Sequence, residues 1–145
     1  MRGLFDINLL ISLLDRGHTL HERAHAWWSA NLSAGWSSCP LTENGLIRIM
    51  SNPGYRSNIP LRPSFLAAQL ALFAVETNHE FWPDSLSFRD DRYFGLDQMQ
   101  TGRSLTDIYL LGLAASRDGR LVTFDRNIPL SIVPSARPAH LCVIL

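Results

Sequence analysis

Two short apolar segments of the sequence each run into an aspartate. "GLFD" ends on Asp6 and "LVTFD" ends on Asp125. Runs such as Leu121–Phe124 are typical of buried strands. A carboxylate directly after a buried strand is typical of the carboxyl edge of a parallel sheet, where the functional groups of α/β proteins collect. We therefore expect both acids to project from the rim of a sheet rather than to be buried.

Two further acids occupy positions that such a sheet would bring to the same edge. Glu43, in "PLTENGLIRI", falls in the first turn of a helix that follows a second strand. Asp107, in "SLTDIYLLGLA", reaches the rim only if the N-terminus of its helix lies there. Four converging carboxylates repel one another unless a cation neutralises them, and oxygen ligands select Mg²⁺ or Mn²⁺. Such a site can activate water for displacement at a phosphodiester.

Each acid also has an ordinary structural explanation. Asp6 could cap the helix that follows it, and the helix macrodipole would favour Glu43. Ser104 and Asp107 match an S-x-x-D capping box, and Asp125 opens the turn "DRN". These explanations are independent of one another, whereas a shared metal site accounts for all four acids at once.

The elements that would position these acids alternate between strand and helix. This alternation predicts an α/β fold with a parallel sheet of about five strands and helices on both faces. Residues 84–103 are polar with interspersed aromatic residues, and they predict a partly helical connection on the surface. The expected strands are Gly3–Asp6, Gly35–Cys39, "HEFWP", "RLVTF" and "LCVIL", and the expected helices are Leu9–Leu14, "HTLHERAHAWWSANLSA", Pro40 to Met50, "PSFLAAQLALFAVET" and Ser104–Ser116.

The length and charge of the chain restrict its class. With 145 residues, 46% of them hydrophobic, we expect a single domain over residues 1–145. The formal net charge is zero, so a nucleic acid would have to be bound by local groups rather than by an overall basic field. All 13 basic residues are arginine, which excludes every mechanism that requires a lysine.

The cysteines and the N-terminal segment indicate the compartment. Cys39 and Cys142 form no C-x-x-C pair, and two buried free thiols in a reducing cytosol explain them more simply than a structural disulfide. The apolar run "LLISLL" is too short for a signal core or a membrane span. We expect a soluble, cytoplasmic protein with no membrane partner.

The motifs "LFDINLLI", "TENGLIRI", "GRSLTDIYLLGLA" and "LVTFDRNI", in this order, resemble those of the PIN-domain ribonucleases, in particular the VapC-type toxins of bacterial toxin–antitoxin pairs. The resemblance extends from residue 3 to about residue 130. It implies a PIN-like three-layer fold and an endoribonuclease that uses carboxylate-held Mg²⁺ or Mn²⁺ to hydrolyse RNA. As catalytic residues and metal ligands it implies Asp6, Glu43, Asp107 and Asp125.

The resemblance also implies binding groups and partners. Arginines would hold RNA phosphates, and neighbouring polar side chains would form hydrogen bonds with the substrate. The implied partners are the RNA substrate, a cognate antitoxin protein and a second copy in a homodimer. Trp27, Trp28 and Trp36 could line such protein surfaces, although their spacing is also that of core residues. The implied substrate-binding residues are Asn8, Thr106, Arg103, Arg126 and Asn127, with Arg89 and Arg92 as further phosphate contacts, and Asp84, Asp90 or Asp91 could add a metal ligand.

Three other classes of protein share part of this pattern. Receiver domains and haloacid-dehalogenase-type phosphatases also use strand-end aspartates with Mg²⁺, but they need a lysine. "HERAH" matches H-E-x-x-H, with His21 and His25 one turn apart and His18 nearby, but a zincin needs a third ligand and a long supported helix. The remaining alternative is a catalytically silent PIN-like module that binds RNA or protein.

Overall fold

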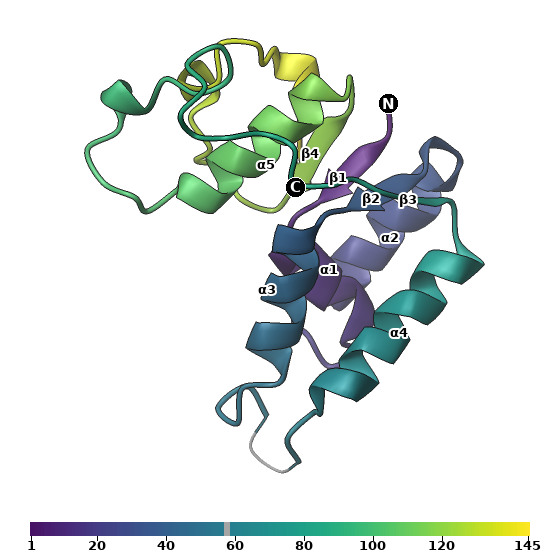
Figure 1. Cartoon of the computed structure of the whole chain (residues 1–145). Helices are drawn as coiled ribbons and strands as arrows, with labels where there is room; N and C mark the ends of the chain where they lie inside the picture. The colour runs from purple at the N-terminus through teal and green to yellow at the C-terminus, as the bar shows by residue number, and fades with distance from the viewer. Residues whose placement is uncertain (57–58) are drawn as a thin grey trace.

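The computed structural model describes residues 1–56 and 59–145, and its centre is a five-stranded sheet (Figure 1). The strands lie in the order β3-β2-β1-β4-β5, and every neighbouring pair is parallel. The predicted fold class and all five predicted strands are therefore confirmed. The strands are β1 (Gly3–Phe5), β2 (Trp36–Ser38), β3 (His79–Phe81), β4 (Arg120–Thr123) and β5 (Leu141–Val143).

The helices begin where the sequence offers a suitable first turn. The first begins at Ile7, two residues before the predicted Leu9, because the Asp6 carboxylate caps it by accepting the backbone N–H of Leu9. Pro40 and Pro63 each occupy a first turn, where the missing N–H of proline removes no intrahelical hydrogen bond. The helices are α1 (Ile7–Leu14), α2 (His21–Asn31), α3 (Pro40–Met50), α4 (Pro63–Glu76) and α5 (Leu105–Ser116), with 3-10 turns at Leu32–Ala34, Leu96–Gln98, Leu130–Ile132 and Pro138–His140.

Alternating strand residues face two separate cores. Leu4 and Leu121 belong to a core that they share with the buried side of α5, including Leu111. Phe5 and Val122, one position further along the same strands, belong to a core with residues of α1, α2, α3 and α4. The two cores lie on opposite faces of the sheet because successive side chains of a strand point to opposite sides. The result is the three-layer arrangement that the resemblance implied.

The strand order places a topological switch point between β1 and β4. From β1 the chain builds outward to β2 and then β3, and it then returns to the other side of β1 to form β4 and β5. Ligands of open α/β sheets bind outside the carboxyl ends of the strands at such a point. Asp6 follows β1 directly, and Asp125 follows β4 after one intervening residue, so the two acids lie at this position.

The connection over residues 84–103 differs from the prediction. Its helical content is the 3-10 turn Leu96–Gln98, and it is not confined to the surface. Phe94 is buried against Tyr109 of α5, with ring centroids 6.0 Å apart, and Phe88 packs on both rings. The aromatic residues that interrupt this polar segment anchor it to the core on the α5 face.

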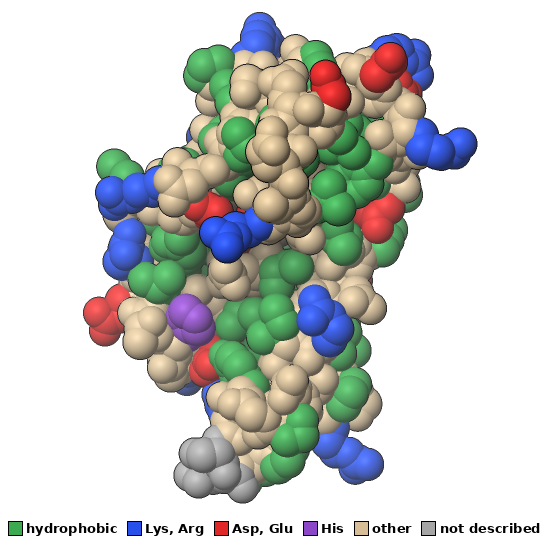
Figure 2. Space-filling model, turned by 90° about the vertical axis from the view of Figure 1, so that its left-hand side faces the viewer, with side chains coloured by type: hydrophobic (Ala, Val, Ile, Leu, Met, Phe, Trp, Pro, Cys, Tyr) green, Lys and Arg blue, Asp and Glu red, His purple; other side chains and the backbone are tan. Residues whose placement is uncertain are grey.

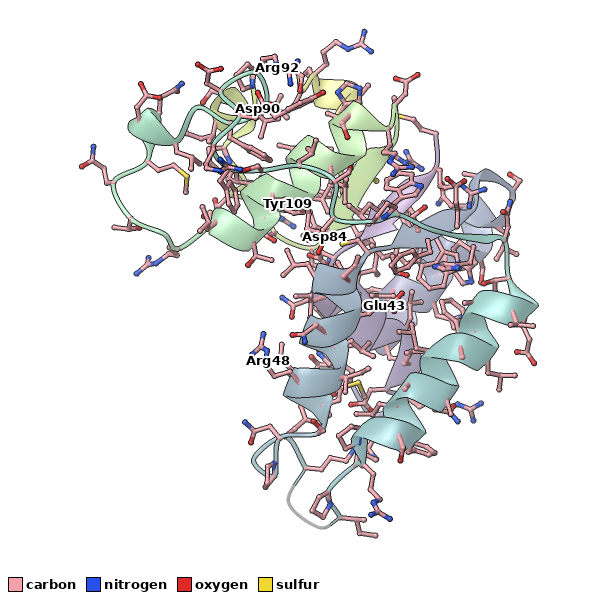
Figure 3. All side chains as sticks on the ribbon, viewed as in Figure 1. Glu43, Arg48, Asp84, Asp90, Arg92 and Tyr109 are labelled. Atoms are coloured by element: carbon pink, nitrogen blue, oxygen red, sulfur yellow. The ribbon has the colours of Figure 1, made fainter. Side chains whose placement is uncertain are left out.

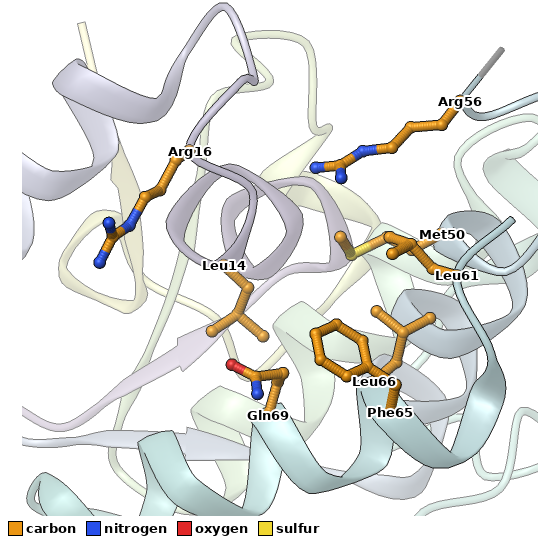
Figure 4. A pocket seen from close by; sticks show the side chains of 8 residues that line it. All are labelled: Leu14, Arg16, Met50, Arg56, Leu61, Phe65, Leu66 and Gln69. Atoms are coloured by element: carbon orange, nitrogen blue, oxygen red, sulfur yellow. The ribbon is translucent and has the colours of Figure 1, made fainter. Parts of the chain in front are cut away.

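Helices α3 and α4 extend side by side away from the sheet (Figure 1). Helix α4 is apolar around most of its circumference. Part of this apolar surface is not covered by the described residues, since Phe65, Leu72 and Val75 are 51%, 51% and 84% exposed. A pocket lies near the far end of α1, close to the ends of α3 and α4 (Figure 4). It is lined by Leu14, Arg16, Met50, Arg56, Leu61, Phe65, Leu66 and Gln69.

Two further sequence expectations can be compared with the structure. Both cysteines are free, but only Cys39 is buried, whereas Cys142 is partly exposed. Burial raises the pKa of the Cys39 thiol to about 11. Among the residues that the structure describes, no helix combines the length and apolar character that a membrane span requires.

Candidate active site

Asp6 is held at the switch point by both of its carboxylate oxygens. Oδ1 accepts the backbone N–H of Leu9 at 2.7 Å, and Oδ2 accepts the hydroxyl of Thr123 at 2.5 Å. The carboxylate is 5% exposed, so the expectation that the strand-end acids would not be buried is wrong for this residue. It is buried because it caps α1 and bonds across the sheet to the end of β4 at the same time.

Thr123 joins Asp6 to Asp125. Its Oγ1 donates to Asp6 and accepts the backbone N–H of Asp125 at 3.0 Å. The carboxylate of Asp125 accepts the backbone N–H of Asn127 at 2.8 Å, in the turn that the sequence indicated, and the residue is exposed. One buried hydroxyl therefore fixes the spacing between an inner and an outer acid.

Asp107 lies in the first turn of α5, and it is close enough to Asp6 and Asp125 for the charges of these acids to interact, so the N-terminus of this helix reaches the same edge. Ser104 forms no side-chain capping bond, so the capping box that the sequence offered as an alternative is absent from this described segment. Burial raises the pKa of Asp107, and the charge of Asp125 raises it further. A structural capping role does not explain this carboxylate.

The three aspartates affect one another electrostatically. Burial raises the pKa of Asp6 to about 6, against the opposing effect of the hydrogen bonds from Thr123 and Leu9, and the charges of Asp107 and Asp125 raise it further. A carboxylate that is dehydrated and surrounded by other carboxylates favours a proton or a bound cation. The arrangement therefore has the electrostatic character of a cation site.

Glu43 belongs to a neighbouring hydrogen-bonded group. It lies in the first turn of α3, and its Oε2 accepts the hydroxyl of Ser38 at 2.6 Å. Ser38 ends β2 and also lies 2.8 Å from Nε2 of His79 on β3. Burial lowers the pKa of His79, partly offset by the charge of Glu43. Glu43 is thus fixed to the carboxyl end of the sheet, next to the strand that carries Asp6.

The donor set fits a hard divalent cation in kind. All of its ligand atoms would be carboxylate oxygens, and the charges of neighbouring acids raise the pKa values of Asp6 and Asp107. As their side chains are placed, however, no group of three or more His, Cys, Asp or Glu among residues 1–56 and 59–145 is arranged to hold a metal ion. The acids converge from four segments without closing on one point.

Three residues of this site were not predicted from the sequence, namely Thr123, Ser38 and His79. The two hydroxyl residues share one signal, because each is the last residue of a strand that ends at the acidic edge. A small polar residue at the end of an apolar run could have identified Thr123, whereas Ser38 follows another serine in its strand. His79 carries no such local signal, since only the β2–β3 pairing brings it to Ser38.

The predicted substrate-binding residues all lie at exposed positions around the acids. Asn8 is in the first turn of α1, and Thr106 precedes Asp107 in α5. Arg103 lies just before α5, and Arg126 and Asn127 follow Asp125 in the chain.

The loop after β3 separates into two parts. Asp84 affects the pKa values of Cys39 and Tyr109, and it is drawn beside the start of α3 (Figure 3). Asp90 forms an ion pair with Arg92, with Oδ2 and the guanidinium nitrogen 2.7 Å apart, and both lie further along the loop (Figure 3). Asp84 therefore remains the better candidate for an additional ligand, and Asp90 already has a cationic partner.

Two histidines, one in α2 and one in the loop before it, form hydrogen bonds within the protein. Nδ1 of His18 accepts the backbone N–H of Leu20 at 3.0 Å, and Nδ1 of His21 bonds to the Ser12 carbonyl at 2.7 Å. His25 is exposed on the helix surface. Two of the three rings therefore bind backbone groups at or before the start of α2.

The tryptophans are mainly core residues. Trp28 and Trp36 are buried in the core on the α1–α4 side, and Trp27 packs against that core while partly exposed. Their suggested role in lining a protein surface is wrong for Trp28 and Trp36. Large apolar side chains that are exposed include Phe65, Leu72 and Val75 of α4.

Comparison with known sequences identifies a family model and relatives that cover most of the chain. The family model of the PIN domain matches residues 4–130. A relative from Mycobacterium tuberculosis (strain ATCC 25618 / H37Rv), named ribonuclease VapC44, is 42% identical over 147 aligned residues, which cover 99% of this chain and 100% of the relative. Ribonuclease VapC39 of the same strain is 38% identical over 125 residues, which cover 86% of this chain and 89% of the relative.

A solved structure has a similar fold. It is the crystal structure of VapBC2 from Rickettsia felis bound to a DNA fragment from their promoter. The TM-score is 0.60, the sequence identity is 12%, and the match covers 99% of this chain and 97% of that chain. At this identity the likeness concerns the fold alone.

Proposed function

Because the chain belongs to the PIN-domain family, as a relative of the VapC ribonucleases, we propose that it is a divalent-metal-dependent endoribonuclease and the toxin of a toxin–antitoxin pair. The observation that carries this proposal is the position of Asp6, Asp107 and Asp125 at the switch point of the sheet, where burial raises the pKa of Asp6 and of the partly buried Asp107. The activity is hydrolysis of RNA phosphodiester bonds.

Four acids are proposed as the catalytic residues and metal ligands: Asp6, Glu43, Asp107 and Asp125. One or two Mg²⁺ or Mn²⁺ ions bound there would lower the pKa of a coordinated water and stabilise the negative charge that develops on the phosphate. The chain's own contribution is to fix the acids in advance. Thr123 and Leu9 N–H orient Asp6, and Ser38 orients Glu43, so the orientation of these two acids is set before a cation binds.

The residues around the acids would hold the substrate. The guanidinium groups of Arg103 and Arg126 suit bidentate contacts to RNA phosphates, and Asn8, Thr106 and Asn127 suit hydrogen bonds to the backbone or bases. On the face shown in Figure 2, the basic side chains lie as separate groups rather than as one continuous patch. This distribution supports a grip by individual arginines, in keeping with a net charge of zero.

The proposed partners are a cognate antitoxin and a second copy of the chain. The exposed apolar side chains of α4, among them Phe65, Leu72 and Val75, support an interface with another protein. The solved VapBC2 structure is that of a related fold. We place the protein in the cytoplasm and treat residues 1–145 as one PIN domain.

The test is a cleavage assay with the purified, antitoxin-free protein and total RNA. We expect discrete cleavage products with Mg²⁺ or Mn²⁺ and none after chelation with EDTA. Asp107→Asn should remove cleavage, because it takes away one charged ligand at nearly constant volume. Asp97→Asn is the matched control on an exposed turn and should cleave like the wild type. RNA binding without metal-dependent cleavage would instead support a catalytically silent binding module.

A further inference from the structure

Glu43 is linked to the sheet by Ser38 and, behind it, by His79, a side chain to which the proposed mechanism gives no function. Ser38 is fully buried, and its Oγ lies 2.6 Å from Glu43 Oε2 and 2.8 Å from His79 Nε2. These residues come from β2, α3 and β3. Three elements of the fold therefore meet at one hydroxyl group.

The donor and the acceptor in each of these two hydrogen bonds can be assigned by counting the available protons. A serine hydroxyl has one proton, and an ionised carboxylate can only accept. The Ser38 proton therefore goes to Glu43, and His79 must carry a hydrogen on Nε2, which it donates to Ser38 Oγ. The direction of donation is His79 to Ser38 to Glu43, and each bond strengthens the next.

The imidazole of His79 is itself held by the core. It lies against the ring of Trp36, with centroids 4.4 Å apart and an interplanar angle of 51°. Trp36 is fully buried, and its Nε1 donates to Thr77 Oγ1 at 2.8 Å, just before β3. The ring that starts the hydrogen-bonded chain is thus a fixed support rather than a mobile surface group.

The same design occurs at the other strand-end hydroxyl. Thr123 accepts a backbone N–H and donates to Asp6, as Ser38 accepts from His79 and donates to Glu43. In both cases one carboxylate oxygen is bound by a hydroxyl at the last position of a strand. For Glu43 the oxygen bound in this way is Oε2.

We propose that His79 is a positioning residue, which acts through Ser38 to hold Glu43 in the orientation that a divalent cation requires. This inference rests on the proposed function, because it takes Glu43 as a metal ligand. His79 contacts neither the cation nor the RNA. Its role is to fix the hydroxyl of Ser38, and through it the side-chain torsions of Glu43.

The experiment measures Mn²⁺ binding to the full chain by calorimetry, without RNA. His79→Leu removes the donor and keeps the bulk, and we expect Mn²⁺ to bind about 10-fold more weakly. His79→Gln places an amide N–H near the position of Nε2, and we expect it to restore binding to within about 3-fold of the wild type. Ser38→Ala should weaken binding as much as His79→Leu, and the double variant should be no weaker than Ser38→Ala alone.

Glu80→Gln is the control on the same strand. Glu80 faces the other side of β3, where it contacts Arg2 and Trp82, so Mn²⁺ binding should be unchanged. In the metal-free wild type, ¹⁵N NMR of the His79 ring should show a protonated Nε2. This measurement decides the donor assignment even if His79→Leu does not fold.

Three results would overturn the positioning role. They are an unprotonated Nε2, equal binding by the Leu and Gln variants, and losses that add in the double variant. Wild-type protein that binds Mn²⁺ and cleaves RNA, together with an unaffected His79→Leu, would overturn this inference alone. Wild-type protein that binds no Mn²⁺ would overturn the metal-dependent function as well.

Discussion

Helix α1 has a buried aspartate at each end, and the two have opposite electrostatic surroundings. Asp6 precedes the helix and Asp15 follows it, and their exposed fractions are 5% and 7%. Although burial by itself would raise the pKa of Asp15, hydrogen bonds from Tyr55, the Gly17 N–H and Arg56 lower it overall. Burial raises the pKa of Asp6, and neighbouring carboxylates add to the effect.

The difference separates a structural acid from one that we propose to be functional. Asp15 binds Arg56 at 2.8 Å and the hydroxyl of Tyr55, so the protein itself supplies a cation and donors that join the loop after α3 to the end of α1. Asp6 has two donors, but its charged neighbours are other acids. A buried carboxylate whose charge the fold leaves uncompensated indicates a site for an external cation.

The largest expected effect is on cleavage by an Asp6→Asn variant. The amide keeps an acceptor for Leu9 N–H but removes the charge, so we expect the cleavage rate to fall by at least about 100-fold. The assay is initial-rate RNA cleavage in Mn²⁺. An Asp15→Asn variant, assayed at a temperature where it remains folded, should keep wild-type cleavage. Equal losses in the two variants would contradict the distinction between the two acids.

The second prediction concerns the stability of the metal-free protein between pH 4 and pH 6. The folded-state pKa of Asp6, about 6, lies above its ordinary value of 3.8, so the folded state binds more protons in this window. The free energy of unfolding should therefore fall as the pH rises from 4 to 6, with Asp6 contributing about 2 kcal/mol to the change. Asp15 has the opposite sign, because its lowered pKa contributes stability above pH 4 that is lost in more acidic solution.

Urea denaturation in EDTA at several pH values measures this contribution. Wild-type protein should lose stability across the window, and Asp6→Asn should show a flatter profile with higher stability at pH 7. Addition of Mn²⁺ at pH 7 should restore much of the difference in the wild type, because a ligand of the folded state stabilises it. A wild-type profile as flat as that of the variant would contradict the raised pKa.

A smaller effect is expected from Asp15→Asn. The substitution removes the charge that Arg56 and Tyr55 compensate, and it should lower the free energy of unfolding by about 2 kcal/mol at pH 7. Chemical denaturation at pH 7 measures the loss. A variant as stable as the wild type would mean that the ion pair between Asp15 and Arg56 does not stabilise the contact between the end of α1 and the loop after α3.

The smallest effect is expected from Tyr55→Phe. Only the hydroxyl that donates to Asp15 is lost, and the ring keeps its packing, so we expect a loss of about 1 kcal/mol. A double-mutant cycle with Asp15→Asn should show that the two losses are not additive. Additive losses would indicate that Tyr55 stabilises the fold by contacts other than this hydrogen bond.

Local patterns in the sequence were sufficient for the elements and for the candidate acids. The short apolar runs and the Pro-initiated helices lie where they were predicted, within about two residues. The edge on which Asp6 and Asp125 lie also followed from strand ends, since parallel strands share a carboxyl edge. That these acids and Glu43 and Asp107 bind a metal stays a prediction.

What the sequence did not reveal depends on pairing between distant segments. The burial of Asp6 requires the hydroxyl of Thr123, and the support of Glu43 requires His79, which is brought close only by the β2–β3 register. The same holds for the 84–103 connection, where Phe94 is buried by its packing on α5 rather than by any local period. Alternation within a strand reports which face a side chain occupies, but not how deeply its surroundings cover it.

The link between Thr123 and Asp6 spans 117 positions of the chain. Segments that end before β4 contain Asp6, Glu43 and Asp107, but they lack both Thr123 and Asp125. During synthesis the acidic centre is therefore incomplete until the ribosome has released the fourth strand, because contacts of such long sequence separation close last. Prematurely terminated chains should accordingly be harmless to RNA, and the hydrolytic capacity of the protein should arise in one late step of folding.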